Sequence, residues 1–201
     1  MEGLPGSTHQ VQQIVLEDSG TLEKAAGDVR AAYGRCDILI NSAGFTKSVP
    51  HANLDGMTDD LMDSVLIANV RGPFATIRAF APLMRETGDS VIINVSSIAG
   101  FTGSGSSIAY AAAKAALDTL TMSLGRVLGP EIRVIAVSPG AVNTDFVVGR
   151  TQEVLMKHAA ESPLKRIVQP ADVAQTIMGC IVYMKNTTGA KIICDGGRFL
   201  A

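Results

Sequence analysis

Residues 90–95 have the sequence Ser-Val-Ile-Ile-Asn-Val, a nearly continuous apolar run rich in β-branched side chains. Three other short runs have the same character, at Asp37–Asn41, Ile132–Val137 and Lys191–Cys194. None of the four alternates between apolar and polar residues, which is typical of strands that are covered on both faces. Gln12–Leu16 is a weaker fifth candidate for a strand.

Helices are expected between these runs, at Thr21–Tyr33, Thr58–Arg85, Ser107–Leu128 and Ala171–Met184. Strands that alternate with helices of this length predict an α/β fold, a doubly wound parallel sheet of the Rossmann type with helices on both faces. We expect residues 1–201 to form a single domain, because the chain shows no linker, internal repeat or low-complexity tract.

The second of these helices carries two local signals. Thr58 can cap its first turn, and the acidic residues Asp59 and Asp60 favour the positive end of the helix dipole. Gly72-Pro73 falls inside the same helix. Proline lacks an N–H group, so we expect the helix to be kinked or split there.

Composition excludes several classes of function. The formal net charge of −2 gives no basic face for nucleic acid. No apolar run approaches the roughly 18 residues of a membrane span, and no signal peptide is visible, so a cytoplasmic protein without a membrane or nucleic-acid partner is expected. The three histidines and three cysteines show no metal-ligand spacing, so no metal site is expected.

Ligands of an open parallel sheet bind beyond the carboxyl ends of its strands. The four strong runs lead into Asn41–Gly44, Ser96-Ser97, Ser138–Gly140 and Asp195–Gly197. These small and polar residues could meet along one edge of the sheet, and we expect the functional site there.

Tyr110 and Lys114 lie four residues apart on the third expected helix, separated by three alanines. Their side chains therefore project from one helix face. An ammonium close to a phenol favours the phenolate and lowers the tyrosine pKa from its ordinary value near 10, which would let Tyr110 exchange protons near neutral pH. A Tyr-x-x-x-Lys pair can also arise by chance, so this motif alone is only suggestive.

Taken together, the motifs resemble those of the short-chain dehydrogenase/reductase family. The residues that carry the resemblance are Asn41-Ser42-Ala43-Gly44, Asn69, Ser97, Tyr110, Lys114, Pro139-Gly140 and Thr144, in the family's order and spacing. Ser97 lies 13 residues before Tyr110, as its family counterpart does. The likeness runs from about Gln12 to the Asp195–Gly197 end, which is most similar to the 3-oxoacyl-carrier-protein reductase branch.

The resemblance implies a catalytic role for four residues. Tyr110 would exchange a proton with the substrate oxygen while hydride passes to or from a nicotinamide. Ser97 would hydrogen-bond the same oxygen, and Lys114 would lower the Tyr110 pKa and bind the nicotinamide ribose. Asn69 would anchor a water in the proton path. Taken singly, Ser97 could be an ordinary loop hydroxyl and Asn69 a helix residue that bonds locally.

The implied cofactor is NAD or NADP, and the substrate is an alcohol/ketone pair. Besides Tyr110 and Lys114, the resemblance assigns cofactor contacts to Asn41, Ala43, Gly44, Pro139, Gly140, Val142 and Thr144. Ser42 departs from the family's second asparagine in this motif, and Pro139-Gly140 could also be an ordinary turn. Substrate identity would depend mostly on residues Asn143–Ser162.

Family members begin with a strand, a glycine-rich turn, a helix and a second strand, and this N-terminal β-α-β portion is absent from the sequence. Gly103-Ser104-Gly105 follows no strand and is expected to be a loop. The missing turn binds the pyrophosphate, so weaker cofactor binding is expected. Loss of a central strand should also leave two unpaired sheet edges and a large exposed apolar face.

Two functions from different classes follow. The first, which we favour, is an active NAD(P)-dependent oxidoreductase that forms a homodimer or homotetramer, as relatives do. The second is a catalytically silent, cofactor-poor remnant that acts as an oligomerisation or binding module.

Overall fold

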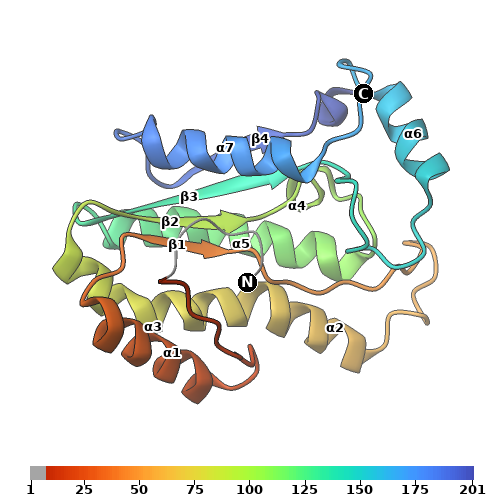
Figure 1. Ribbon diagram of the computed structural model, residues 1–201. Coiled ribbons are helices and arrows are strands. Elements are labelled where there is room, and N and C mark those ends of the chain that lie inside the picture. Colours follow the sequence, from red (N-terminus) through yellow and green to blue (C-terminus); the bar gives the residue numbers. More distant parts are fainter. Residues whose placement is uncertain (1–7) are drawn as a thin grey trace.

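The computed structural model describes residues 8–201 and contains a four-stranded parallel sheet (Figure 1). Its strands are β1 (Ile38–Asn41), β2 (Ser90–Val95), β3 (Ile132–Pro139) and β4 (Ala190–Cys194). They are arranged in the order β1-β2-β3-β4, and every neighbouring pair is parallel. The four strong apolar runs are therefore the four strands, and the predicted doubly wound α/β fold is confirmed.

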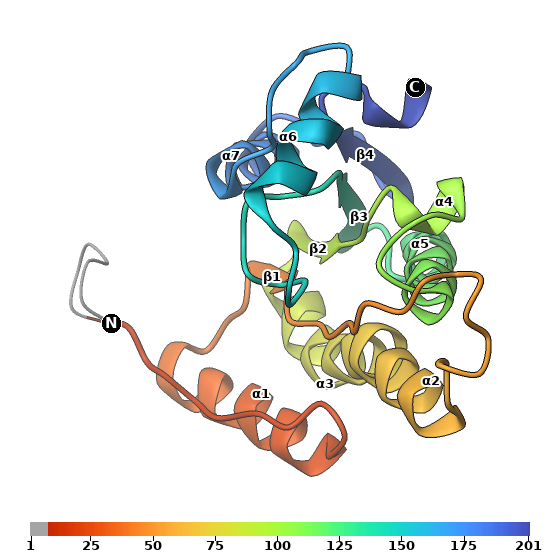
Figure 2. The same ribbon diagram turned by 90° about the vertical axis from the view of Figure 1, so that its right-hand side faces the viewer.

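Helices cover both faces of the sheet. The helices α3 (Gly72–Thr87) and α5 (Ile108–Val127) lie on one face and α7 (Pro170–Val182) lies on the other (Figures 1 and 2). Alternate strand residues supply the two cores: Ile92 and Val134 pack with α3, whereas Ile93 and Ile135 pack with α7. Each such side chain contributes about 1.5–3 kcal/mol by burial, which explains why the strands are apolar on both faces.

The remaining elements lie around this core. The helix α1 (Ser19–Tyr33) packs against α3 and away from the strands, as Figure 2 shows. The short helix α4 (Ala99–Thr102) follows β2 in the sequence, and α6 (Gln152–Glu161) comes after β3 and before α7. Gly103 closes α4 in the left-handed conformation, so the glycine-rich stretch that begins there is a loop, as expected.

The helix expected from Thr58 to Arg85 changes its winding just before Gly72-Pro73, where a kink or a split was expected, but it does not break. It consists of α2 (Asp59–Leu66), a π-helical turn η1 (Ile67–Arg71) and then α3. The Thr58 hydroxyl caps α2 by accepting from the Leu61 N–H at 3.3 Å. Because Pro73 has no N–H, it cannot close the usual bond to the carbonyl four residues earlier, and the wide turn absorbs the change.

The expectation of a strand at Gln12–Leu16 is wrong, because this segment finds no strand to pair with. Side chains take its backbone groups instead: the Val15 N–H donates to the Thr21 hydroxyl at 3.0 Å, and a guanidinium N–H of Arg71 donates to the Leu16 carbonyl at 3.3 Å. Within residues 8–201 no strand adjoins the outer edge of β1. Ile38 and Ile40 are 45% and 44% exposed there, so exposed apolar surface lies at one of the two expected unpaired edges. The other does not form, because Gln12–Leu16 is not a strand.

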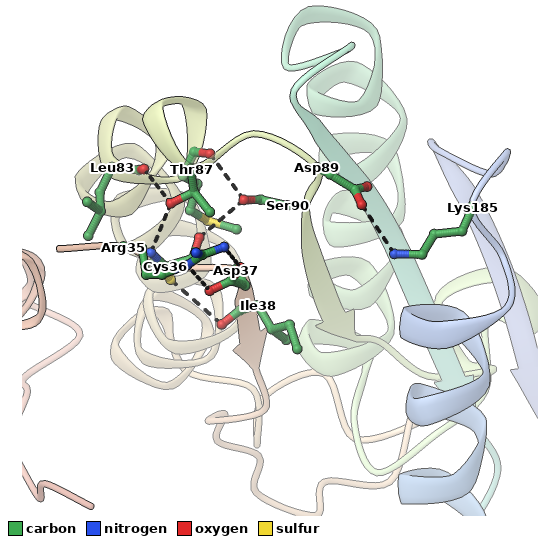
Figure 3. Close-up of polar contacts among 10 residues, drawn as sticks. Arg35, Cys36, Asp37, Ile38, Leu83, Thr87, Asp89, Ser90 and Lys185 are labelled. Atoms are coloured by element: carbon green, nitrogen blue, oxygen red, sulfur yellow. Dashed lines mark hydrogen bonds and ion pairs between the residues drawn. The ribbon is translucent and has the colours of Figure 1, made fainter. Parts of the chain in front are cut away.

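The amino-terminal end of the sheet is held by short polar contacts between α3 and the first two strands (Figure 3). The Ser90 hydroxyl is placed to donate to the carbonyls of Cys36 and Met84, at 3.2 and 3.1 Å. The Cys36 N–H donates to the Thr87 hydroxyl at 3.1 Å, and Thr87 in turn donates to the Leu83 carbonyl. These bonds satisfy buried main-chain groups and fix the strand register.

None of the helices within residues 8–201 is long and apolar enough to cross a membrane. The same part of the chain contains no group of three or more His, Cys, Asp or Glu side chains that could hold a metal ion. Its three cysteines are free thiols.

Candidate active site

The carboxyl ends of the four strands form one edge of the sheet, as expected from their parallel order. Main-chain bonds tie these ends together: Ile98 N–H donates to the Pro139 carbonyl at 3.0 Å, and Gly140 N–H donates to the Cys194 carbonyl at 3.1 Å. Ser97 and Pro139-Gly140 are therefore neighbours at one edge. In an open parallel sheet this edge is where ligands bind.

Tyr110 is brought to this edge by the first turn of α5. The buried Ser107 hydroxyl caps the helix by accepting from the Tyr110 N–H at 3.2 Å, which fixes where the helix begins. The Ser97 hydroxyl lies close enough to the Tyr110 phenol to act on it, in the direction that lowers the pKa of Tyr110. The Ser97 hydroxyl also accepts from the Ala99 N–H at 3.2 Å, so it is held in place on the side of β2.

Lys114 lies one helical turn further on, with its ammonium nitrogen 5.5 Å from the centre of the Tyr110 ring. Its side chain is only 5% exposed and donates to the Val95 carbonyl at 2.8 Å. Burial lowers the pKa of Lys114 to about 8, and the nearby Asp118 carboxylate opposes that change. The structure thus brings Ser97, Tyr110 and Lys114 into one cluster.

Burial also governs the other titratable member of the cluster. It raises the pKa of Tyr110 to about 12, while the nearby Ser97 hydroxyl and the charge of Arg150 act in the opposite direction. The prediction that Lys114 would bring the Tyr110 pKa down is therefore wrong for this structure. Lys114 is buried and Tyr110 is partly buried, which disfavours the ammonium and the phenolate alike. The ammonium also donates to a carbonyl instead of the phenol oxygen.

Asn69 is fully buried in the π-helical turn η1. Its amide nitrogen donates to the Phe45 carbonyl at 2.6 Å and to the Val65 carbonyl at 2.9 Å. Its amide oxygen is buried without a hydrogen-bond partner. A Cβ atom on Gly44 would lie 2.7 Å from that oxygen, so only glycine leaves room at this point.

The predicted cofactor residues after β1 also lie at the carboxyl ends of the strands. The Asn41 amide donates to Asn94 at 2.9 Å, and Asn94 donates to the Thr121 hydroxyl on α5 at 3.0 Å. This buried chain of amides orients the end of β1 toward α5. Asn41, Ser42 and Ala43 line a mainly apolar pocket beside the open edge of β1.

The predicted cofactor residues after β3 lie in the segment that folds back over Tyr110. A Cβ atom on Gly140 would lie 3.0 Å from the Cβ of Asp195, so a side chain there would crowd the end of β4. Thr144 N–H donates to the Val142 carbonyl at 2.9 Å. In the same segment the Phe146 ring lies 6.0 Å from the Tyr110 ring, centre to centre.

These residues fit the nicotinamide half of a dinucleotide. The buried Asn69 oxygen has no hydrogen-bond partner and is free to accept from a bound group, and the missing side chain of Gly44 lets the segment after β1 lie close to Asn69. The part of the chain that the structure describes holds no strand, glycine-rich turn and helix at this edge that would receive the pyrophosphate half.

Comparison with known proteins shows the family to which the chain belongs. A family model described as enoyl-(acyl carrier protein) reductase matches residues 7–198. The 3-oxoacyl-[acyl-carrier-protein] reductase FabG of Thermotoga maritima is 33% identical over 200 residues, which cover 98% of this chain and 79% of that protein. The chain belongs to the short-chain dehydrogenase/reductase family.

Two further members of the short-chain dehydrogenase/reductase family illustrate the range of the match. The short-chain dehydrogenase/reductase homolog YusR of Bacillus subtilis is 42% identical over 131 residues, covering 65% of this chain and all of that protein. The structure of 7α-hydroxysteroid dehydrogenase complexed with NADH and 7-oxo glycochenodeoxycholic acid matches with a TM-score of 0.83 and 27% identity, over 91% of this chain and 71% of that one.

Family membership decides between the two classes of function expected from the sequence. Members of the short-chain dehydrogenase/reductase family are NAD(P)-dependent oxidoreductases, and the chain is an oxidoreductase of this kind. The alternative of a catalytically silent remnant is not supported.

Sequence reasoning missed two residues beside Tyr110. Arg150 and Phe146 lie in the segment expected to govern substrate identity, but neither belongs to a motif and no spacing connects them with Tyr110. Only the fold of the segment after β3 brings them to the site.

Proposed function

We propose that the chain reduces a ketone to the corresponding alcohol, with Tyr110 as the proton donor. The proximity of the Tyr110 and Ser97 hydroxyls, at the carboxyl ends of the strands, carries this proposal. A substrate oxygen bound between the two hydroxyls would meet two donors at once. When bound, the nicotinamide cofactor supplies the hydride.

The reduction direction is favoured by the raised pKa of Tyr110. At about 12, this pKa keeps the phenol protonated at neutral pH, so that Tyr110 holds a proton to donate. An alkoxide that develops on the substrate is more basic than the phenolate, so the proton transfers to it readily. Ser97 stays in place and stabilises the developing charge by hydrogen bonding.

Lys114 and Asn69 serve the proton's return and the cofactor's position. The Lys114 ammonium, one turn from Tyr110, would bind the nicotinamide ribose and pass a proton toward the tyrosine. The Asn69 amide oxygen, buried and without a partner, is available to bind a water that leads to solvent. Lys114, with a pKa of about 8, can exchange that proton at physiological pH.

The residues proposed to hold the nicotinamide cofactor, NAD or NADP, are those that surround this cluster. They are Asn41, Ala43, Gly44, Tyr110, Lys114, Pro139, Gly140, Val142 and Thr144. Their support is the geometry of the site: Gly44 and Gly140 both stand where a side chain would collide with a neighbour.

We also propose that residues 1–201 act as one domain in a cytoplasmic homodimer or homotetramer. Apolar side chains exposed on α5, including Met122 and Val127, support a subunit interface on that helix. Sedimentation velocity would test this: a purely monomeric boundary at micromolar concentration would exclude it.

The catalytic proposal is tested by Tyr110→Phe. We expect loss of NADH- or NADPH-dependent ketone reduction by about 10²- to 10⁴-fold, the usual contribution of a general acid. The far-ultraviolet circular dichroism and the urea midpoint should show that the variant remains folded. Tyr183→Phe is the matched control, because Tyr183 lies at the exposed end of α7. Normal turnover by Tyr110→Phe would exclude the assigned role.

A further inference from the structure

Arg150 lies on the segment between β3 and α6, beside the proposed reaction centre. One of its terminal guanidinium nitrogens donates to the Val142 carbonyl at 2.6 Å. This bond pins the guanidinium to the start of the segment that carries Phe146, whose ring lies 6.0 Å from that of Tyr110. Arg150 is therefore held close to the tyrosine and does not extend into solvent.

No acidic side chain within residues 8–201 forms an ion pair with Arg150. Its Nε atom is buried and has no hydrogen-bond partner. Two other arginines of the C-terminal part of the chain differ, since Arg166 pairs with Asp172 and Arg198 pairs with Glu161. A half-buried guanidinium with unused donors is costly unless an anion completes it.

The charge of Arg150 reaches the reactive hydroxyl. It acts to lower the pKa of Tyr110, and Tyr110 acts to raise the pKa of Arg150 against the effect of burial. A group bound to Arg150 would therefore lie close to the carbonyl that Tyr110 protonates.

We propose that Arg150 is a specificity residue that binds a carboxylate, and that the substrate is an oxo acid with this carboxylate near its ketone. This inference rests on the proposed function. A guanidinium offers parallel N–H donors that match the two oxygens of a carboxylate. A single cation neutralises a carboxylate, whereas a phosphate dianion would call for a second cation.

The test compares oxo acids with their methyl esters, which present the same ketone without the charge. Acetoacetate and levulinate place the carboxylate at two distances from the carbonyl. The wild-type protein should reduce at least one acid with a higher kcat/KM than its ester. Arg150→Met should lower the acid-to-ester ratio about 10- to 100-fold, the range for hydrogen bonds to charged groups, mainly through KM. Arg150→Lys should retain part of the ratio, because lysine keeps the positive charge but lacks the two parallel N–H donors of the guanidinium.

Arg126→Met is the matched control, since Arg126 lies exposed on the last turn of α5. This variant should leave the acid-to-ester ratio at its wild-type value. The ester reports any effect of Arg150→Met that acts through Tyr110 or the fold of the segment, because such an effect lowers acid and ester alike. An equal loss for both compounds, or a wild-type preference for esters, would overturn the assignment.

Calorimetric titration separates this inference from the proposed function. Wild-type protein with NADH or NADPH should bind the acid more tightly than the ester, and Arg150→Met should lose that difference. Arg150-dependent binding of the acid without reduction of any ketone would refute the proposed function and leave the carboxylate site standing. Reduction of ketones without any preference for acids would refute the carboxylate site alone.

Discussion

Replacing Lys114 with methionine should stabilise the protein at pH 7 while it abolishes reduction. The Lys114 side chain is 5% exposed, and burial lowers its pKa from the ordinary 10.5 to about 8. At pH 7 the lysine is protonated in both the folded and the unfolded chain, so the folded chain carries the full cost of a buried ammonium. This cost amounts to about 3 kcal/mol, since each tenfold loss of proton affinity corresponds to about 1.4 kcal/mol.

The same linkage fixes how the effect changes with pH. The folded-state pKa of Lys114 lies below the unfolded value, so between about pH 8 and 10.5 the unfolded chain binds more protons and stability rises with pH. The advantage of Lys114→Met should therefore shrink by about 2 kcal/mol between pH 7 and pH 9.5. Loss of the 2.8 Å bond to Val95 subtracts about 1 kcal/mol at pH 7, which leaves a net gain of about 2 kcal/mol there.

Urea denaturation of the wild type and the variant at the two pH values measures this difference. Lys157→Met serves as the control, because Lys157 is an exposed residue of α6 and should show no such dependence on pH. A free-energy difference between wild type and Lys114→Met that is the same at pH 7 and pH 9.5 would refute the reasoning, since the buried charge would then not be the cause.

Three further predictions concern the frame of the site. Gly125→Ala would place a Cβ atom 2.7 Å from the Gly189 nitrogen and should cost about 1–3 kcal/mol by urea denaturation, whereas Gly179→Ala, with open space, should not. Arg133→Met would free three carbonyls near the end of α7 and should lower the unfolding free energy by about 2–4 kcal/mol; an unchanged midpoint would contradict this. Ser107→Ala removes the cap of α5 and should cost about 1 kcal/mol and reduce kcat, and unaltered kinetics would argue against its positioning of Tyr110.

Much of the fold could be predicted because strands and helices have different local signatures. The strand at Ser90–Val95 is buried on both faces, and its sequence shows this directly. Gln12–Leu16 has a similar local pattern, yet it forms no strand, because a strand also needs a hydrogen-bonded neighbour and β1 lies elsewhere. Pairing is a property of the whole chain, so local sequence could not decide this point.

The sequence allowed the residues of the site to be predicted, but not their pKa values. The helical spacing of Tyr110 and Lys114 indicated a shared face, and the structure brings them together. The direction of the Tyr110 pKa could not be inferred from spacing, because it depends on how much water the packed site excludes. The position of Arg150 near Tyr110 could not be predicted either, because it depends on the path of an irregular segment.

The π-helical turn Ile67–Arg71 lets one continuous helical stretch pack against two different partners. Before the turn, Val65 packs with Ala109 and Ala113 of α5; after it, α3 packs on the sheet. Successive residues of an α-helix are rotated by about 100° around its axis. Deleting one residue from the wide turn would therefore rotate the apolar face of α3 away from the sheet. A variant in which this stretch is redesigned as one regular α-helix would therefore keep either the contact with α5 or the contact with the sheet, but not both.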